Sequence, residues 1–166
     1  MEWMYYESPI GRLTVGAKQG KLCGLWIEGQ KYYPSSLPLI NTMNTASPVL
    51  MQAKLWLDDY FSGKEPAAEN LPLLLEGTEF QQAVWRLLME IPYGKTVTYG
   101  SLAKEIAREV GAAHMSSQAV GGAVGRNPIS IIVPCHRVVG AKGQLTGYAG
   151  GIECKRWLLF HEATHT

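Results

Sequence analysis

Residues 131–138 constrain the fold and the chemistry of this chain more than any other segment. Their sequence, Ile-Ile-Val-Pro-Cys-His-Arg-Val, places a cysteine and a histidine side by side in an otherwise apolar stretch. Such a stretch predicts a buried strand or extended segment over residues 129–133. Thiolate is the nucleophilic form of cysteine, and a nearby imidazole is a common way to form it near neutral pH. We therefore expect Cys135 to be a nucleophile that His136 activates.

The length and composition indicate a folded protein rather than a disordered one. The chain has 166 residues, of which 46% are hydrophobic and 17% are charged. This suits one ordinary domain, or two small ones that share a core. Its first residues lack the pattern of a signal peptide, and no apolar run is long enough to span a bilayer, so no membrane association is expected.

The cysteine count argues against a disulfide framework, because three cysteines are an odd and sparse set. Reduced thiols favour a cytoplasmic location. A cysteine in an apolar setting is usually an inert core residue. We expect this of Cys23 and Cys154, whereas Cys135 differs because a histidine adjoins it.

The net charge of +1 does not by itself indicate a nucleic-acid binder. Residues 1–77 carry six basic and eight acidic side chains, and residues 78–166 carry nine basic and six acidic ones. The basic half is therefore the half that holds the cysteine-histidine motif. The bias is mild, and it carries little weight alone.

The first half of the chain reads as a small sheet followed by a helix. Short alternating segments separated by Gly and Pro turns predict an antiparallel meander. The predicted strands are residues 4–7, 12–15 and 22–27. Residues 30–46 are predicted to be a loop, and a helix should run from the Ser47-Pro48 cap to Gly63. The polar stretch 63–70 is the best candidate for a linker, with a domain boundary near residue 75.

The second half reads as a series of capped helices. Ser or Thr ahead of an apolar periodic segment marks a helix start, and a Gln three residues later adds a capping box. The predicted starts are Thr78, Thr98 and Ser116 or Ser117, and a last helix is predicted over 152–162. The third helix should end at Asn127-Pro128. A short helix that follows another after a turn is typical of a helix-turn-helix.

The third helix contains Gly121-Gly122, which costs about 1 kcal/mol per glycine relative to alanine. Its face around Ala119 and Gly122 is nearly bare. One interpretation is close packing on a neighbouring helix, and the other is a slim helix that enters a narrow groove. Reading bases in the major groove needs long polar side chains, and this helix offers almost none.

Three segments together carry a resemblance to a known family. They are Asn127-Pro128, the Pro-Cys-His-Arg motif around Cys135, and Thr-Gly-Tyr-Ala-Gly-Gly at 146–151. This pattern resembles the active-site signature of the O6-alkylguanine-DNA alkyltransferases, also called methylated-DNA–protein-cysteine methyltransferases. The resemblance is specific over residues 78–166 and weak before them.

The resemblance implies an α+β fold with two domains. Residues 1–75 would form a ribonuclease H-like α/β support domain with a short antiparallel sheet. Residues 76–166 would form a mainly helical, winged-helix-like domain with the helix-turn-helix, which binds DNA and carries the alkyltransferase site.

The implied activity is DNA repair by direct transfer of an alkyl group from O6-alkylguanine in duplex DNA to Cys135. The product thioether is stable, so one molecule would repair one lesion without a cofactor. In the family a water links the cysteine to the histidine, here His136, and Glu162 holds that histidine. Without the resemblance, Glu162 would read as a solvated residue near a helix end.

The resemblance also places residues around the extruded guanine. Tyr99 would hydrogen-bond the base and help to rotate its phosphate, although its spacing alone fits a buried core tyrosine equally well. Val138, Tyr148 and Ala149 would line the guanine pocket, with backbone groups of Val138 and Ala149 contacting the base.

The implied partner is double-stranded DNA, bound through its minor groove by a monomer. Ala119 and Gly122 would belong to the recognition helix, and Asn127 would tie that helix to the cysteine segment. Family members have an arginine that fills the gap left by the extruded base, and Gln118 stands at its position. The segment before Gln118 is longer than in many relatives, which makes His114 and Met115 alternative candidates for this role.

Other functional classes compete with this interpretation. A cysteine hydrolase could use Cys135 and His136, although such enzymes normally draw these residues from distant parts of the chain. A non-catalytic helix-turn-helix module would leave Cys135 merely buried. His161 and His165 could share a helix face as metal ligands, but no third ligand accompanies them, so no metal site is expected.

Overall fold

A three-stranded antiparallel sheet forms the first part of the fold. The structure is a computed structural model that describes residues 1–31 and 47–166, so most of the predicted loop over 30–46 lies outside the described residues. The strands are β1 (Glu2–Ser8), β2 (Gly11–Lys18) and β3 (Lys21–Ile27), in the order β1-β2-β3. The predicted meander is confirmed.

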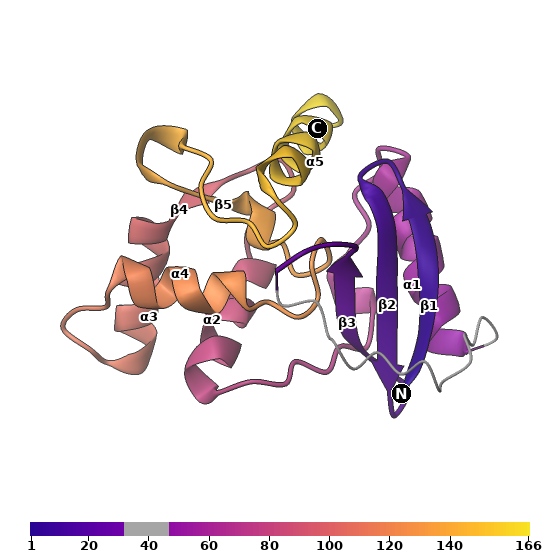
Figure 1. Cartoon of the computed structure of the whole chain (residues 1–166). Coiled ribbons are helices and arrows are strands. Elements are labelled where there is room, and N and C mark those ends of the chain that lie inside the picture. The colour runs from indigo at the N-terminus through magenta and orange to yellow at the C-terminus, as the bar shows by residue number, and fades with distance from the viewer. Residues whose placement is uncertain (32–46) are drawn as a thin grey trace.

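Helix α1 (Pro48–Phe61) covers one face of this sheet and contacts all three strands (Figure 1). It begins at the predicted proline, although the Ser47 side chain makes no capping hydrogen bond. It ends two residues before Gly63, whose φ of 96° is a conformation that glycine adopts without strain. Buried residues of the helix and the sheet form one core, which includes Leu13, Leu25 and Leu57.

Helices dominate the second part of the chain, where α2, α3 and α4 pack together and α5 lies between them and the sheet (Figure 1). The helices are α2 (Glu79–Met89), α3 (Tyr99–Val110), α4 (Ser117–Gly125) and α5 (Ile152–Thr164). Thr78 and Thr98 form the capping boxes that start α2 and α3, and Ser116 rather than Ser117 caps α4. The predicted helix starts and the α+β class are confirmed.

Short elements complete the fold. They are the three-residue helical turns η1 (Ala68–Asn70), η2 (Cys135–Arg137) and η3 (Ala141–Gly143), and the parallel strand pair β4 (Val97–Thr98) and β5 (Val138–Val139). No helix within the described residues is both long and apolar enough to cross a membrane.

The strand or extended segment predicted over residues 129–133 is wrong in conformation, although its predicted burial is confirmed. Ile129 makes a single bridge to Leu25 of β3, and the chain then turns through Ile131, whose φ is 73°. The side chain of Asn127 explains the turn. Its Oδ1 accepts from the Ile129 N–H at 3.0 Å, and its Nδ2 donates to the Val133 carbonyl at 2.7 Å. A local side-chain hydrogen bond thus replaces a ladder partner.

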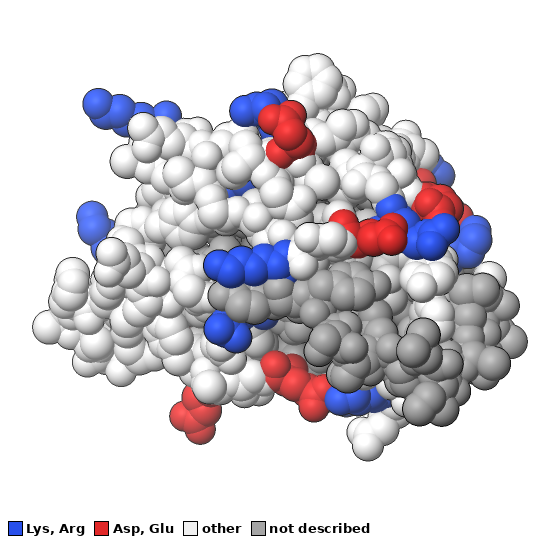
Figure 2. Space-filling view, in the orientation of Figure 1, with Lys and Arg blue, Asp and Glu red and all other residues white. Residues whose placement is uncertain are grey.

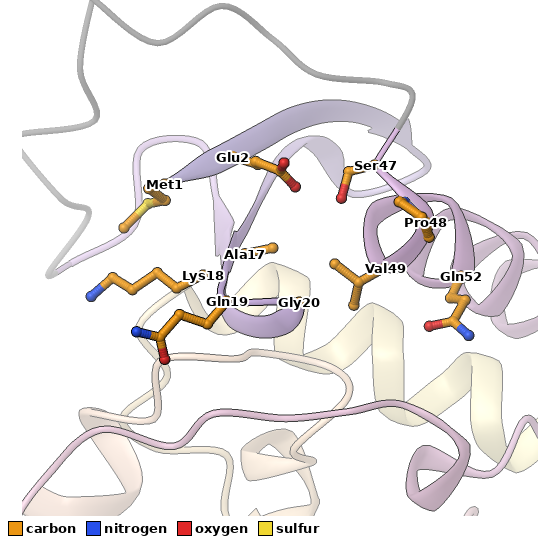
Figure 3. Close-up of a pocket in the computed structure, with 10 residues that line it drawn as sticks. All are labelled: Met1, Glu2, Ala17, Lys18, Gln19, Gly20, Ser47, Pro48, Val49 and Gln52. Atoms are coloured by element: carbon orange, nitrogen blue, oxygen red, sulfur yellow. The ribbon is translucent and has the colours of Figure 1, made fainter.

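A pocket of about 580 Å³ lies in the first part of the molecule, between the β2–β3 turn and the start of α1 (Figure 3). Its polar wall includes Glu2, Lys18 and Gln52. None of the candidate site residues lines this pocket, so it is separate from the site described below.

Candidate active site

The turn η2 places Cys135 and His136 inside the protein. Cys135 is 5% exposed and His136 is fully buried. The Cys135 N–H donates to the Val133 carbonyl at 2.8 Å, which helps to close a local turn rather than an extended chain. His136 Nδ1 is buried and has no hydrogen-bond partner within the described residues.

The other ring nitrogen of His136 contacts Glu162 of α5. The distance from His136 Nε2 to Glu162 Oε2 is 2.5 Å. Arg137 Nε donates to Glu162 Oε1 at 2.7 Å, Tyr60 donates its hydroxyl to Oε2 at 2.7 Å, and the Gly94 N–H donates to Oε1 at 3.2 Å. Glu162 is 1% exposed, so it is not a solvated helix-end residue. A buried carboxylate with this many donors holds the imidazole in a fixed orientation.

Burial and the local charges determine the protonation state of the site. Burial alone would raise the pKa of Glu162, but the hydrogen bonds and charges of His136 and Arg137 hold that pKa below its ordinary value. Burial lowers the pKa of His136 despite the adjacent carboxylate, so the ring is neutral near pH 7. These two shifts favour a neutral base that an anion orients.

The expected thiolate of Cys135 is not the resting form. Burial raises the pKa of Cys135, and a hydrogen bond from Asn127 and the charge of Lys155 offset this only in part. Desolvation penalises the anion more than these groups stabilise it, so the resting state is a thiol beside a neutral imidazole. The thiol therefore has to lose its proton as it reacts.

Lys155 is a site residue that the sequence analysis missed. It is fully buried, and its Nζ donates to the Val138 carbonyl at 2.6 Å and to the Thr146 carbonyl at 3.0 Å. It joins β5 to the glycine-rich loop and brings a positive charge near Cys135. A signal was present, because Lys155 shares a helical face with Leu158 and Glu162.

Tyr99 and Tyr148 both lie near Cys135. Burial raises the pKa of each phenol, and a thiolate at Cys135 would raise it further. The Tyr99 hydroxyl donates to the carbonyls of Thr146 at 3.3 Å and Gly147 at 3.4 Å. The Tyr148 hydroxyl is buried, and Ser130 lies close enough to it to lower the pKa of the phenol in part.

Backbone groups of Val138 and Ala149 are predicted to contact the base, and the carbonyls of both residues already have partners. The Val138 carbonyl accepts from Lys155, and the Ala149 carbonyl accepts from the Lys31 N–H at 3.0 Å. Contacts of Val138 and Ala149 with a base stay predictions.

Helix α4 presents an open face. Gln118, Ala119 and Gly122 are exposed, whereas Val120, Ala123 and Val124 are buried. A Cβ added at Gly122 would meet nothing within 4 Å, and one at Gly121 would meet the Tyr99 ring at an ordinary 3.8 Å. Close packing on a neighbouring helix therefore does not explain these glycines. Figure 2 shows that the surface over α3 and α4 is mostly uncharged on the face it displays.

The three candidates for the residue that fills the gap left by the extruded base differ in how exposed their side chains are. Met115 is half-buried and packs against the core, whereas His114 and Gln118 are exposed. Gln118 lies in the first turn of α4, where its N–H donates to the Ser116 hydroxyl at 3.1 Å. Of these three side chains, the exposed pair has the freedom to enter a duplex.

The histidines of the C-terminal helix contact backbone carbonyls. His161 Nε2 lies 2.7 Å from the Tyr60 carbonyl, and His165 Nδ1 lies 2.6 Å from the His161 carbonyl. Within residues 1–31 and 47–166, no three His, Cys, Asp or Glu side chains are grouped so that they could hold a metal ion.

Comparisons with known proteins cover both parts of the chain. Residues 1–75 match the ribonuclease-like domain of 6-O-methylguanine DNA methyltransferase, and residues 79–164 match its DNA binding domain. The methylated-DNA–protein-cysteine methyltransferase of Haemophilus influenzae is 43% identical over 95% of this chain and 83% of its own length. The corresponding protein of Methanosarcina acetivorans is 42% identical over 96% of both chains.

Solved structures agree with the sequence relatives. The Mycobacterium tuberculosis protein OGT in complex with DNA has a TM-score of 0.86 and 40% identity, covering 100% of this chain and 95% of that one. The O6-methylguanine DNA methyltransferase of Methanococcus jannaschii has a TM-score of 0.67 and 27% identity, covering 98% and 95%. The chain belongs to the 6-O-methylguanine DNA methyltransferase family.

Proposed function

We propose that this protein repairs DNA by moving the alkyl group of O6-alkylguanine in duplex DNA onto Sγ of its own Cys135. One observation carries the proposal. Cys135 adjoins a neutral His136 whose other ring nitrogen is held by the buried anion of Glu162. The three residues therefore supply a nucleophile, the base that activates it and the group that orients the base.

The reaction is a single displacement at a saturated carbon. Because Nε2 of His136 is engaged by Glu162, Nδ1 accepts the thiol proton by way of a bridging water. Sγ forms a bond to the alkyl carbon, the bond from that carbon to O6 breaks, and its electron pair stays on guanine. A hydrogen bond from Tyr99 stabilises the departing base, which gains the released proton by exchange with solvent. The product is a thioether, so each molecule reacts once.

The DNA partner has to present its base outside the stack, because Cys135 is buried. Base extrusion costs a few kcal/mol, and a side chain that fills the gap offsets part of it. We place α4 in the minor groove, with Gln118 in the gap, in a monomer that needs no cofactor. The exposed, bare face at Ala119 and Gly122 supports this placement. A cytoplasmic location stays a prediction.

Mass spectrometry tests the proposed reaction directly. Protein incubated with duplex DNA that contains O6-methylguanine should gain the mass of one methyl group, and peptide mapping should place it on Cys135. An unmodified protein would contradict the proposal, and so would a methyl on Cys23 or Cys154.

Gln118→Arg should tighten binding to undamaged and damaged duplexes alike. A guanidinium contributes a phosphate-directed charge that the amide lacks. The slope of log affinity against log salt should steepen by about 0.9, which a fluorescence anisotropy titration at several salt concentrations measures. Gln118→Met, of similar length but uncharged, is the matched control and should keep the wild-type slope. An unchanged slope in Gln118→Arg would place this residue away from the DNA.

Gly122→Leu should weaken DNA binding without loss of stability. The added side chain points into open space, and leucine favours a helix by up to about 1 kcal/mol over glycine. Its bulk would keep α4 from a narrow groove, so duplex affinity should fall by about tenfold or more. Gly122→Ala gains the same propensity with little bulk and should bind nearly as the wild type does. Equal affinity of the leucine and alanine variants would argue against α4 as the groove-binding helix.

A further inference from the structure

Tyr60 connects the N-terminal helix α1 to the reacting residues of the second part. Its hydroxyl donates at 2.7 Å to Oε2 of Glu162, the same oxygen that contacts His136 Nε2 at 2.5 Å. Tyr60 is 1% exposed, and 102 residues of chain separate it from Glu162. The sequence predicts only a supporting role for residues 1–75, whereas this contact links α1 directly to the carboxylate that holds His136.

We propose that Tyr60 is a positioning residue for alkyl transfer, and that its hydroxyl sets how strongly Glu162 holds the His136 proton. The inference rests on the proposed function, because it concerns the same transfer to Cys135. Tyr60 touches neither the thiol nor the base, and it acts through Glu162.

The surroundings of Tyr60 hold its hydroxyl in place. Its ring stacks on Trp56 of the same helix, with centroids 5.6 Å apart and an interplanar angle of 7°. Its carbonyl contacts Nε2 of His161, the residue that precedes Glu162 on α5. Backbone and side chain of Tyr60 thus contact consecutive residues of α5, which fixes the hydroxyl against the carboxylate.

Electrostatics predicts in which direction the hydrogen bond from Tyr60 to Glu162 changes the protonation of His136. Each donor to Oε2 takes part of the negative charge that stabilises a proton on His136. Without the Tyr60 hydroxyl, Glu162 would be more basic and a protonated His136 more stable. The neutral imidazole that accepts the thiol proton would then form only at higher pH. A stronger donor at position 60 would act in the opposite direction.

Other groups around this centre stay the same when only position 60 is altered. Among the described residues, the titratable and charged groups that face Glu162 and His136 are Tyr60 from α1, Tyr93 between α2 and β4, Arg137 from η2, Tyr148 from the glycine-rich loop, and Lys155 from α5, with Cys135 next to His136 in the chain. A change in pH dependence would therefore report on the Tyr60 contact.

The experiment compares two variants that each remove one phenol-to-carboxylate hydrogen bond. Tyr60→Phe keeps the ring that stacks on Trp56. Tyr6→Phe is the matched control, because the Tyr6 hydroxyl donates at 2.7 Å to Asp58 on the same helix, away from the site. Single-turnover transfer from O6-methylguanine duplex is followed against pH. The acidic limb should move up by about half a pH unit or more in Tyr60→Phe and stay in place in Tyr6→Phe.

A second form of the protein tests the direction of the pH shift. With 3-fluorotyrosine at position 60 alone, the more acidic phenol is a stronger donor, and the acidic limb should move down. This form decides the matter if Tyr60→Phe does not fold. If the wild type reacts while the position-60 forms that fold keep its acidic limb, Tyr60 is only structural and the inference is overturned. A wild type that takes up no methyl would overturn the proposed function and this inference with it.

Discussion

Cys135→Ala is expected to abolish alkyl transfer while leaving the fold and the affinity for duplex DNA nearly unchanged. Alanine removes the sulfur that is proposed to form the thioether, and no other thiol lies in this site within the described residues. Truncating one small buried side chain should cost about 1 kcal/mol of unfolding free energy. Single-turnover assays on O6-methylguanine duplex, with anisotropy for binding, measure the two properties separately.

The matched control uses the remaining cysteines. Cys23 is buried in β3 and Cys154 is half-buried in α5, and burial raises the pKa of both thiols. A protein that carries Cys23→Ala and Cys154→Ala should react at the wild-type rate. Transfer by Cys135→Ala, or loss of transfer in the double variant, would show that another thiol is the acceptor.

Glu162→Gln should have the largest combined effect on stability and rate. The carboxylate accepts from His136, Arg137, Tyr60 and Gly94, and an amide offers one oxygen and places an NH₂ group against donors. The Arg137 guanidinium would stay buried without its counter-charge, which costs about 3–5 kcal/mol. Transfer should fall by about a hundredfold, because a misplaced imidazole is a poor base.

Urea unfolding and single-turnover rates measure these effects. Glu153→Gln on the same helix is the control, since Glu153 is exposed and forms a surface ion pair with Arg156. It should change the unfolding free energy by less than about 1 kcal/mol. A Glu162→Gln protein as stable and active as Glu153→Gln would remove Glu162 from the mechanism.

The low pKa of Glu162 also predicts how the wild type responds to acid. A carboxyl whose pKa is depressed in the folded state stabilises the protein above its unfolded-state pKa, and this contribution is lost as the pH falls toward the folded-state value. The difference in unfolding free energy between the wild type and Glu162→Gln should therefore shrink as the solution is acidified below the ordinary glutamate range.

Local signals in the sequence predict much of this fold. The capping box at Thr78 and the cap at Thr98 depend on residues within one helical turn, and both are present; Thr98 also forms a capping box with Ser101. The strand or extended segment predicted over 129–133 is wrong because one side chain, Asn127, takes the hydrogen bonds that a strand ladder would make. The sequence predicts that this segment is buried, but it does not predict the turn that its backbone makes.

Long-range contacts explain what the sequence leaves out of the site. Glu162 and His136 could be paired through the family resemblance, but Tyr60 lies on the apolar face of α1 and reads as a core residue. Its contact with Glu162 exists only once α1 packs beside α5. The expected thiolate of Cys135 fails for a related reason, because the depth of burial of a thiol depends on tertiary packing.

The stoichiometry of repair tests the central claim most directly. Limiting protein is mixed with an excess of duplex that contains O6-methylguanine, and the restored guanine is counted per protein molecule as the reaction runs to completion. The displacement at Cys135 predicts a single restored guanine per molecule, after which the protein is inactive and carries the methyl as a thioether. Continued repair beyond one lesion per molecule, or release of the methyl from the protein, would contradict it.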